Sequence, residues 1–301
     1  MQESRRSYTD TQTIVFTVIL SFICAFILSA LASALSVPKE EAKELDRSRQ
    51  MLQSAQIYNS LGYFQIEKND TYIPAKLVPD GQLVEGTKDD HPSSQDILTV
   101  YRNRIVPILV DDAGNVTSFE KAKINYIDYL RNNKKQGYAN LPLKLAYKIL
   151  PNVPEKEINE DLLPIGYIIP VSGFGLWDAI YGYLAIAPDG DTVIGVAWYD
   201  QKETPGLGAN IAEQDWQSQF PGKKILQADS SGITDFLKSS IGLTVVRGKV
   251  ADVVGREPKA LSSLDGMAGA TLTGNGVTKA YKDSLTPYRN FFKKLHDQNK
   301  K

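Results

Sequence analysis

The segment from Ile14 to Leu35 contains no charged residue and consists mainly of Ile, Leu, Val, Phe and Ala. Its hydroxyl side chains, at Thr17, Ser21, Ser29 and Ser33, are tolerated because they can return a hydrogen bond to the helix backbone. At a rise of about 1.5 Å per residue, a helix over this segment is about 33 Å long, enough to cross the hydrocarbon core of a bilayer. The sequence therefore predicts one transmembrane helix at 14–35, preceded by a short cytoplasmic segment at 1–13.

The residues that flank this helix bear on its orientation. Arg5 and Arg6 precede it, which favours a cytoplasmic N-terminus, although lysines and arginines between 39 and 49 weaken that signal. Two A-x-A patterns, at 30–32 and 32–34, resemble cleavage sites, so a cleaved signal peptide is the competing interpretation. The apolar region of a signal peptide usually spans about 7–15 residues. Because this segment is longer, we favour a retained single-pass anchor.

The composition of the chain excludes several classes of function. Its net charge is −1, so no basic surface for nucleic acid is indicated. The one cysteine, Cys24, cannot form an intrachain disulfide, and the two histidines, His91 and His296, do not stand in a ligand pattern. We therefore expect no metal site, no Ser-His-Asp triad and no catalytic side chain. His296 lies among lysines near the C-terminus and is expected to belong to a solvated tail.

Beyond the anchor, strand and helix patterns do not alternate regularly, which predicts a soluble mixed domain of α+β fold. Two expected strands flank Pro188-Asp189-Gly190-Asp191, a strong hairpin signal. The expected helices lie at 40–58, 209–220 and 275–281, and the expected strands include 98–101, 105–110, 165–169, 183–187, 192–198 and 243–250. We divide this part into a membrane-proximal, variable region at 36–160, a domain that carries the motifs at 161–285 and a C-terminal tail at 286–301.

The run from Asp265 to Gly276 is rich in glycine and alanine and carries two hydroxyls, Thr271 and Thr273. Small residues leave the backbone open to close approach by a large group. One of the two threonines is therefore a candidate attachment point for a cofactor. The alternative is an ordinary glycine-rich turn before a helix, which composition alone favours.

Two further motifs share this lack of side-chain bulk. In the run from Glu203 to Ala209, Pro205-Gly206 favours a tight turn, and Gly208 lets backbone N–H groups face outward. Such donors suit an anion or the carbonyl edge of a flavin, whereas the alternative is a turn that caps a helix. In the run from Ser172 to Trp177, glycines lie beside a large aromatic, and the commoner role of Trp177 would be a buried core residue.

Together the three motifs resemble the FMN-binding domain family, and within it the C subunits of sodium-translocating NADH:quinone oxidoreductases. The matching stretches are GFGLWDAIYGYLAI at 173–186, WYDQKETPGLGANI at 198–211 and DGMAGATLTGNGV at 265–277. The resemblance covers about 162–281 and the N-terminal anchor, and it leaves roughly 60–150 unexplained. It identifies 161–285 as the FMN-binding domain.

The resemblance also implies the roles of individual residues. The family joins FMN by a phosphoester to the threonine of a D-x-x-[ST]-G-A-T motif, which here is Thr271, after Gly269 and Ala270. Asp265 is the acidic residue read by the flavin transferase that attaches the cofactor, and Ala268 departs from the usual Ser or Thr. The positions that contact the flavin in the family correspond to Leu176, Trp177, Glu203, Thr204, Leu207 and Gly208. Arg247 or Lys249 could balance the remaining phosphate charge.

The function that the resemblance implies is a membrane-anchored flavoprotein that relays single electrons. Electrons would come from NADH at another of six subunits, A to F, and reach ubiquinone while sodium is exported. The N-terminus would be cytoplasmic and the FMN domain periplasmic, in a bacterial inner membrane. One alternative is the G subunit of an Rnf-type ferredoxin:NAD oxidoreductase, whose chain is usually shorter. Another is an anchored periplasmic binding or scaffold protein without a cofactor.

Overall fold

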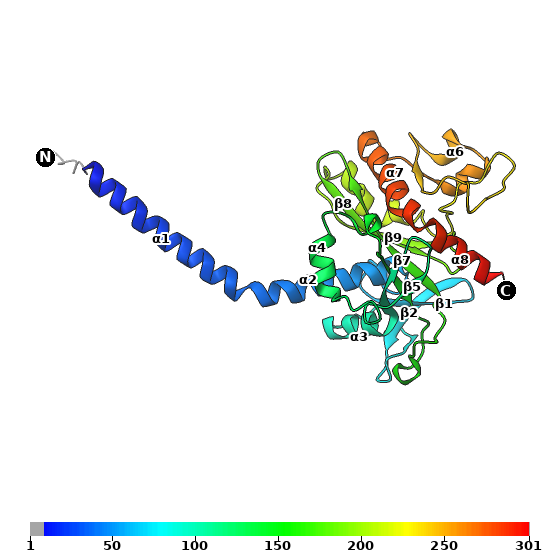
Figure 1. Ribbon diagram of the computed structural model, residues 1–301, viewed down its shortest axis with the longest axis horizontal. Coiled ribbons are helices and arrows are strands. Elements are labelled where there is room, and N and C mark those ends of the chain that lie inside the picture. The colour runs from blue at the N-terminus through cyan, green and yellow to red at the C-terminus, as the bar shows by residue number, and fades with distance from the viewer. Residues whose placement is uncertain (1–8, 301) are drawn as a thin grey trace. The chain divides into compact units, whose positions relative to one another are not determined.

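A computed structural model of the chain describes residues 9–300 (Figure 1). Helix α1 (Asp10–Ala34) begins four residues before the predicted span and ends one residue short of it. It is long and apolar enough to cross a membrane, and none of its residues is buried. The hydroxyls of Thr17 and Ser21 each donate a hydrogen bond to the carbonyl four residues earlier, at 2.9 and 2.8 Å. The predicted apolar helix is confirmed, whereas Arg5 and Arg6 lie outside the described residues.

The second helix, α2 (Ser36–Ser54), connects the apolar helix to the soluble domain. The chain divides into two compact units within α2, the first ending at Arg47 and the second beginning at Ser48. Near the end of α2, Met51 and Leu52 are fully buried in the second unit. The amphipathic helix predicted at 40–58 is therefore present, but it ends at Ser54, and Met51 and Leu52 attach this end to the domain.

The second unit is built on antiparallel sheet. The strands are β1 (Phe64–Lys68), β2 (Thr71–Leu77), β3 (Leu83–Glu85), β4 (Ile105–Val110), β5 (Val116–Thr117), β6 (Lys144–Ile149), β7 (Gly166–Phe174), β8 (Ala179–Ile186), β9 (Val193–Asp200), β10 (Thr244–Val245) and β11 (Ser263–Leu264). Among the described residues, a six-stranded sheet has the order β5-β4-β6-β7-β8-β9, with every neighbouring pair antiparallel. Strands β1 to β3 form a separate antiparallel sheet, and β10 and β11 form a short parallel pair.

The hairpin between β8 and β9 forms where the turn signal predicted it. The Oδ1 atom of Asp189 accepts the backbone N–H groups of Asp191 and Thr192, at 2.9 and 2.8 Å. This is the Asx-type turn that an Asp at such a position favours, because its side chain replaces a backbone acceptor. The register of β8 against β7 then places Gly173 opposite Ile180, so that the ends of both strands lie beside the segment that carries Trp177.

Two C-terminal helices cover this sheet. The remaining helices are α3 (Ser94–Arg104), α4 (Tyr126–Asn133), α5 (Gln214–Gln217), α6 (Val250–Val253), α7 (Thr271–Leu285) and α8 (Arg289–Asn299), with single turns at Tyr138–Asn140, Glu155–Glu157, Gly208–Ala212, Pro258–Ser262 and Thr286–Tyr288. Helix α7 packs on β7, and α8 continues across the domain (orange and red in Figure 1). Tyr281 of α7 and Phe291, Phe292 and Leu295 of α8 belong to the core.

Several local expectations differ from the structure. The run at 98–101, expected as strand, lies in α3, whose N-terminus is fixed by reciprocal hydrogen bonds between Ser93 and Asp96. The strand expected at 243–250 is limited to β10; further along the chain, Gly248 adopts a positive φ of 121° and α6 begins at Val250. The helix expected at 209–220 is two short turns. The segment expected as a solvated tail packs into the core, and the His296 ring stacks on Phe236 with centroids 4.0 Å apart.

Candidate functional site

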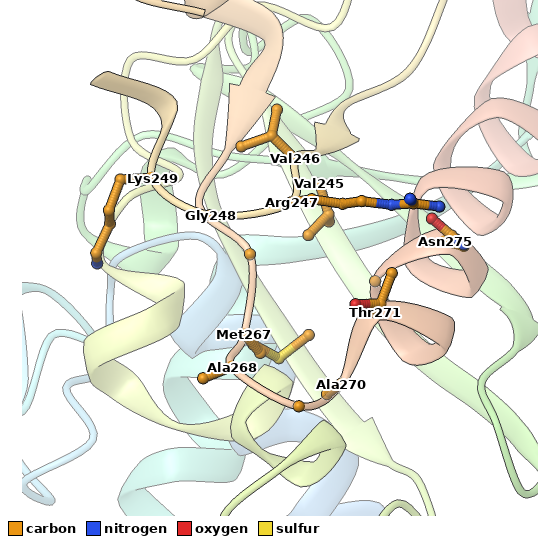
Figure 2. A pocket seen from close by; sticks show the side chains of 13 residues that line it. Val245, Val246, Arg247, Gly248, Lys249, Met267, Ala268, Ala270, Thr271 and Asn275 are labelled. Atoms are coloured by element: carbon orange, nitrogen blue, oxygen red, sulfur yellow. The ribbon is translucent and has the colours of Figure 1, made fainter. Parts of the chain in front are cut away.

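Thr271 is the first residue of α7, and its side chain is exposed at the edge of a pocket of about 300 Å³. Figure 2 shows the two segments that form this pocket, the loop around Arg247 and the loop that leads into α7. The lining residues are Val245, Val246, Arg247, Gly248, Lys249, Gly266, Met267, Ala268, Gly269, Ala270, Thr271, Gly274 and Asn275. The glycine-rich run predicted to hold a cofactor therefore borders an open cavity.

The glycines of this run have two different physical roles. A Cβ atom on Gly266 would lie less than 3.0 Å from the carbonyl oxygen of Val246, so glycine here lets two backbone segments pack directly. Gly269 has a positive φ of 74°, which L side chains rarely adopt, and its missing Cβ faces Leu207. Gly269 thus shapes the turn into α7 and lets the Leu207 side chain approach this turn.

The structure distinguishes between the two hydroxyls of the motif. The Thr273 side chain is buried, and its hydroxyl donates a 2.5 Å hydrogen bond to Oε2 of Glu203. The Thr271 side chain is exposed and faces the pocket (Figure 2). Only Thr271 of the two therefore offers an accessible hydroxyl to an incoming group.

Glu203 lies at the meeting point of the three motifs. Its carboxylate accepts the backbone N–H groups of Leu176 and Trp177, at 3.1 and 3.0 Å, in addition to the hydroxyl of Thr273. Burial raises the pKa of Glu203, but these hydrogen bonds outweigh burial and hold its pKa below the ordinary value, so the side chain is ionised at neutral pH. Glu203 is thus directed into the protein, where it joins the loop before β8 to the first turn of α7.

The aromatic and aliphatic candidates are exposed around this joint. Trp177 is 68% exposed, which overturns the interpretation of a buried core tryptophan, and its Nε1 donates a 3.1 Å hydrogen bond to Oγ1 of Thr204. Leu176 is 47% exposed and Leu207 is 40% exposed. Gly208 is buried, and a Cβ atom there would collide with Thr273 and Glu203. Leu176, Trp177 and Leu207 are thus exposed beside the buried contacts of Glu203, but they are not among the residues that line the pocket.

Asp265 is held in place by its own neighbours. Its Oδ1 accepts the backbone N–H of Val250 at 2.8 Å, and its Oδ2 pairs with Lys249 at 2.9 Å. Burial raises the pKa of Asp265, but these two interactions outweigh it and hold the pKa below its ordinary value. Trp216 also donates to the backbone carbonyl of Asp265, at 2.9 Å. The side chain therefore fastens the two walls of the pocket to each other.

The two cations proposed for a phosphate differ in their placement. Lys249 is engaged with Asp265 and lies on the side of the loop away from Thr271 (Figure 2). The Arg247 side chain is exposed and extends toward Asn275 in the first turns of α7. Of the pair, Arg247 is the cation that lies on the Thr271 side of the pocket.

The sequence does not reveal the contacts through which Glu203 connects the three motifs, nor the partners that hold Asp265, and it does not choose between Arg247 and Lys249. The partners of Glu203 lie 26, 27 and 70 residues away in the chain. Local patterns carry no signal for contacts of this kind. The capping and turn signals that can be detected from sequence involve residues within about four positions.

The sequence profile of the FMN-binding domain family matches residues 175–286, a range that contains Trp177, Glu203 and Thr271. The fold and the site therefore define an α+β flavoprotein domain of the FMN-binding class, joined to one candidate transmembrane helix. This agrees with the resemblance and with the expected fold class.

Similar proteins show to which group of FMN-binding proteins the chain belongs. The C subunit of the Na(+)-translocating NADH-quinone reductase of Chlamydia pneumoniae is 44% identical over 273 residues, which cover 86% of this chain and 85% of the relative. The corresponding protein of Chlamydia caviae is 42% identical over 273 residues, with 87% and 86% covered. The chain therefore belongs to the family of C subunits of Na(+)-translocating NADH-quinone reductases. Coverage of this extent includes most of residues 60–150, which the three motifs left unexplained.

The fold agrees with this membership. The crystal structure of the C subunit of the Na(+)-translocating NADH-quinone reductase from Parabacteroides distasonis matches with a TM-score of 0.53 and 23% identity, over 86% of this chain and 96% of that one. At this identity the likeness concerns the fold alone. This likeness in fold includes the six-stranded sheet as well as the motifs, because the match covers 86% of this chain and 96% of the other.

Proposed function

We propose that this chain is the FMN-carrying subunit of a Na(+)-translocating NADH:quinone oxidoreductase, with FMN joined to Thr271 by a phosphoester. In this role it relays single electrons during the oxidation of NADH by ubiquinone, coupled to sodium export. The observation that carries the proposal is the accessible hydroxyl of Thr271, placed at the edge of the pocket and at the first residue of α7. Thr273, the other hydroxyl of the motif, is buried against Glu203.

The residues around Thr271 fit a phosphorylated flavin. Ala270, the N-cap residue of α7, has no side-chain acceptor, so the N–H groups of the first turn remain available to phosphate oxygens. The positive end of the helix dipole favours an anion at the same place. Arg247 adds a guanidinium on the same side of the pocket, a group that binds phosphate well. These features support attachment of the phosphate end of FMN at Thr271.

The chain's side chains would hold and orient the flavin, and FMN would supply the one-electron chemistry when bound. The exposed faces of Trp177 and Leu176 offer an apolar surface to a planar ring, and Leu207 extends this surface on the side of Gly269. The hydrogen bond from Trp177 to Thr204 fixes the orientation of the indole.

Denaturing gel electrophoresis tests the covalent flavin. The full-length chain, co-expressed with a flavin transferase, is expected to give a band that fluoresces under ultraviolet light after denaturation. Proteolysis and mass spectrometry should place the flavin on the peptide that contains Thr271. Expression without the transferase is the control and should give a dark band. A non-fluorescent chain in the presence of the transferase would refute the proposal and favour an anchored scaffold without a cofactor.

The membrane anchor can be tested separately. We expect α1 to be retained in the mature protein, with the FMN domain periplasmic, because the helix is uncharged and mainly apolar from residue 14 to its end at Ala34. The full-length chain should remain in the membrane pellet after alkaline carbonate extraction, whereas a variant that begins after residue 35 should be released. External protease should digest the domain in spheroplasts. An N-terminal sequence of the mature chain that begins after residue 32 or 34 would show cleavage and contradict the anchor.

The partners follow from the family. The relatives are C subunits of a multi-subunit complex, so we expect this chain to co-purify with five other subunits and to require a flavin transferase. The identity to C subunits over 86% of the chain or more favours this complex over the G subunit of an Rnf-type complex. NADH:quinone activity that depends on sodium, in membranes that contain the chain, separates the two.

A further inference from the structure

We propose that Glu203 is the positioning residue of the flavin site: its carboxylate ties the loop that carries Leu176 and Trp177 to α7, and its buried charge keeps the midpoint potential of the flavin low. The inference rests on the proposed function, because it concerns a flavin bound at Thr271. It assigns to the first residue of the ETPGLG run a role that is distinct from contact with the cofactor.

The tie consists of three hydrogen bonds to one carboxylate. Oε1 accepts from the backbone N–H of Trp177 at 3.0 Å, and Oε2 accepts from the backbone N–H of Leu176 at 3.1 Å. Oε2 also accepts from the hydroxyl of Thr273 at 2.5 Å. Hydrogen bonds to a charged acceptor are stronger than neutral ones. The ring of Trp177 and the helix that begins at Thr271 are therefore held in a fixed relation through a single side chain.

The surrounding glycines leave room for this side chain. A Cβ atom on Gly175 or on Gly208 would lie less than 3.0 Å from the carboxylate of Glu203. Glu203 itself is only 5% exposed. The two glycines belong to different motifs, and both are needed for the carboxylate to reach its three donors. The space that the Glu203 carboxylate needs is therefore a physical reason for Gly175 in the GFGLW run and for Gly208 in the ETPGLG run.

The charge has a consequence for electron transfer. The hydrogen bonds keep Glu203 ionised even though it is buried, and a charge in a low-dielectric environment is screened less than one in water. Thr273, which donates to this carboxylate, is two residues from Thr271, so a flavin held at Thr271 would add negative charge in the same region on reduction. The carboxylate would then oppose reduction and lower the midpoint potential. Removal of the charge should shift the potential in the positive direction.

Three variants separate geometry from charge. Glu203→Gln keeps the size of the side chain but removes its charge and turns an NH₂ group toward the three donors, so at least one hydrogen bond is lost. Glu203→Asp keeps the charge but shortens the reach. Glu213→Gln is the matched control, because Glu213 is exposed in the same segment and its side chain does not cap α5.

The first readout needs no flavin. In the full-length Thr271→Ala chain in detergent, hydrogen exchange followed by mass spectrometry reports on the amides at 174–178. We expect Glu203→Gln and Glu203→Asp to speed exchange there about tenfold, the effect of losing one charge-assisted hydrogen bond. Glu213→Gln should leave this exchange unchanged. Exchange in the peptide that covers β9 should be the same in all variants, which shows that the fold is retained.

The second readout is the midpoint potential of the flavinylated full-length chain, measured by redox titration of the flavin absorbance. Glu203→Gln should have a more positive potential than the wild type, whereas Glu203→Asp and Glu213→Gln should stay close to it. A wild-type potential in Glu203→Gln, or wild-type exchange at 174–178, would overturn the proposal. If Glu203→Gln also speeds exchange in β9, the fold of that variant is disturbed and Glu203→Asp becomes the deciding variant. In that case, wild-type exchange at 174–178 in Glu203→Asp would overturn the proposal.

The failure of this inference can be distinguished from failure of the proposed function. A wild-type chain that takes up no covalent flavin refutes the function. The exchange experiment in the Thr271→Ala chain still tests the tie in that case. Conversely, a fluorescent wild-type band with unchanged exchange and potential in Glu203→Gln refutes the role of Glu203 alone.

Discussion

Thr271→Ala is expected to abolish the covalent flavin. The substitution removes the accessible hydroxyl of the motif, and alanine has no atom that can form a phosphoester. Alanine is a good helix former, so it should be accepted at the first position of α7. In-gel fluorescence of the denatured chain, co-expressed with the transferase, measures the loss directly. A reading of the absorbance before denaturation also detects any flavin that is bound without a covalent bond.

Two further variants make this test specific. Thr273→Val removes the buried hydroxyl with little change in shape and should keep the fluorescent band, because Thr271 is untouched. Thr271→Ser retains a hydroxyl at the same place and should keep at least part of the band. A band that survives in Thr271→Ala and disappears in Thr273→Val would show that the buried threonine is the acceptor.

Tyr281→Ala is expected to destabilise the domain by about 3–5 kcal/mol, the range for deleting a large buried aromatic side chain. Tyr281 is fully buried on α7, where its ring packs against Trp198 and Phe220 with centroids 5.6 and 5.9 Å apart. Its hydroxyl also accepts a 3.0 Å hydrogen bond from Nε1 of Trp198. The loss is a large fraction of the stability of a typical domain, about 5–15 kcal/mol. Urea unfolding followed by tryptophan fluorescence measures it.

The matched control for this substitution is Tyr281→Phe. It keeps the ring but leaves the buried indole N–H of Trp198 without its acceptor, which should cost about 1–3 kcal/mol. The two variants therefore divide the effect between packing and hydrogen bonding. If Tyr281→Ala unfolded at the urea concentration of the wild type, α7 would not be anchored to the sheet through this residue.

The elements predicted from sequence were those with a local physical cause. The apolar helix and the β8–β9 hairpin both formed where expected, because an uncharged run and an Asx turn act over a few residues. The strand predicted at 98–101 is wrong, because these residues lie in helix α3, and a local signal for that helix is present in the sequence. Ser93 and Asp96 form a capping box, and Ile97, Val100, Tyr101 and Arg104 are buried at helical spacing. The β-branched residues of the run concealed this periodicity.

The site was predicted less completely than the fold. The motifs located Thr271, Trp177 and Glu203, and the structure brings their segments together. The direction of each side chain did not follow from sequence, because it depends on contacts between residues up to 70 positions apart. Trp177 is exposed and Glu203 is buried, the reverse of what the polarity of the two side chains suggests.

The position of α8 and of strands β4 and β6 limits which fragment of this chain could be fused to another protein as an FMN-binding domain. The recognisable family segment, 175–286, begins after β7 and ends before the buried aromatics of α8. A fragment cut at those limits would leave the β8 edge without its partner β7 and would remove Phe291, Phe292 and Leu295 from the core. The family match covers the segment that carries the motifs, but we expect the smallest fragment that folds on its own to be longer than this segment. That fragment must also include the strands from Ile105 onward and the helix that ends at Asn299.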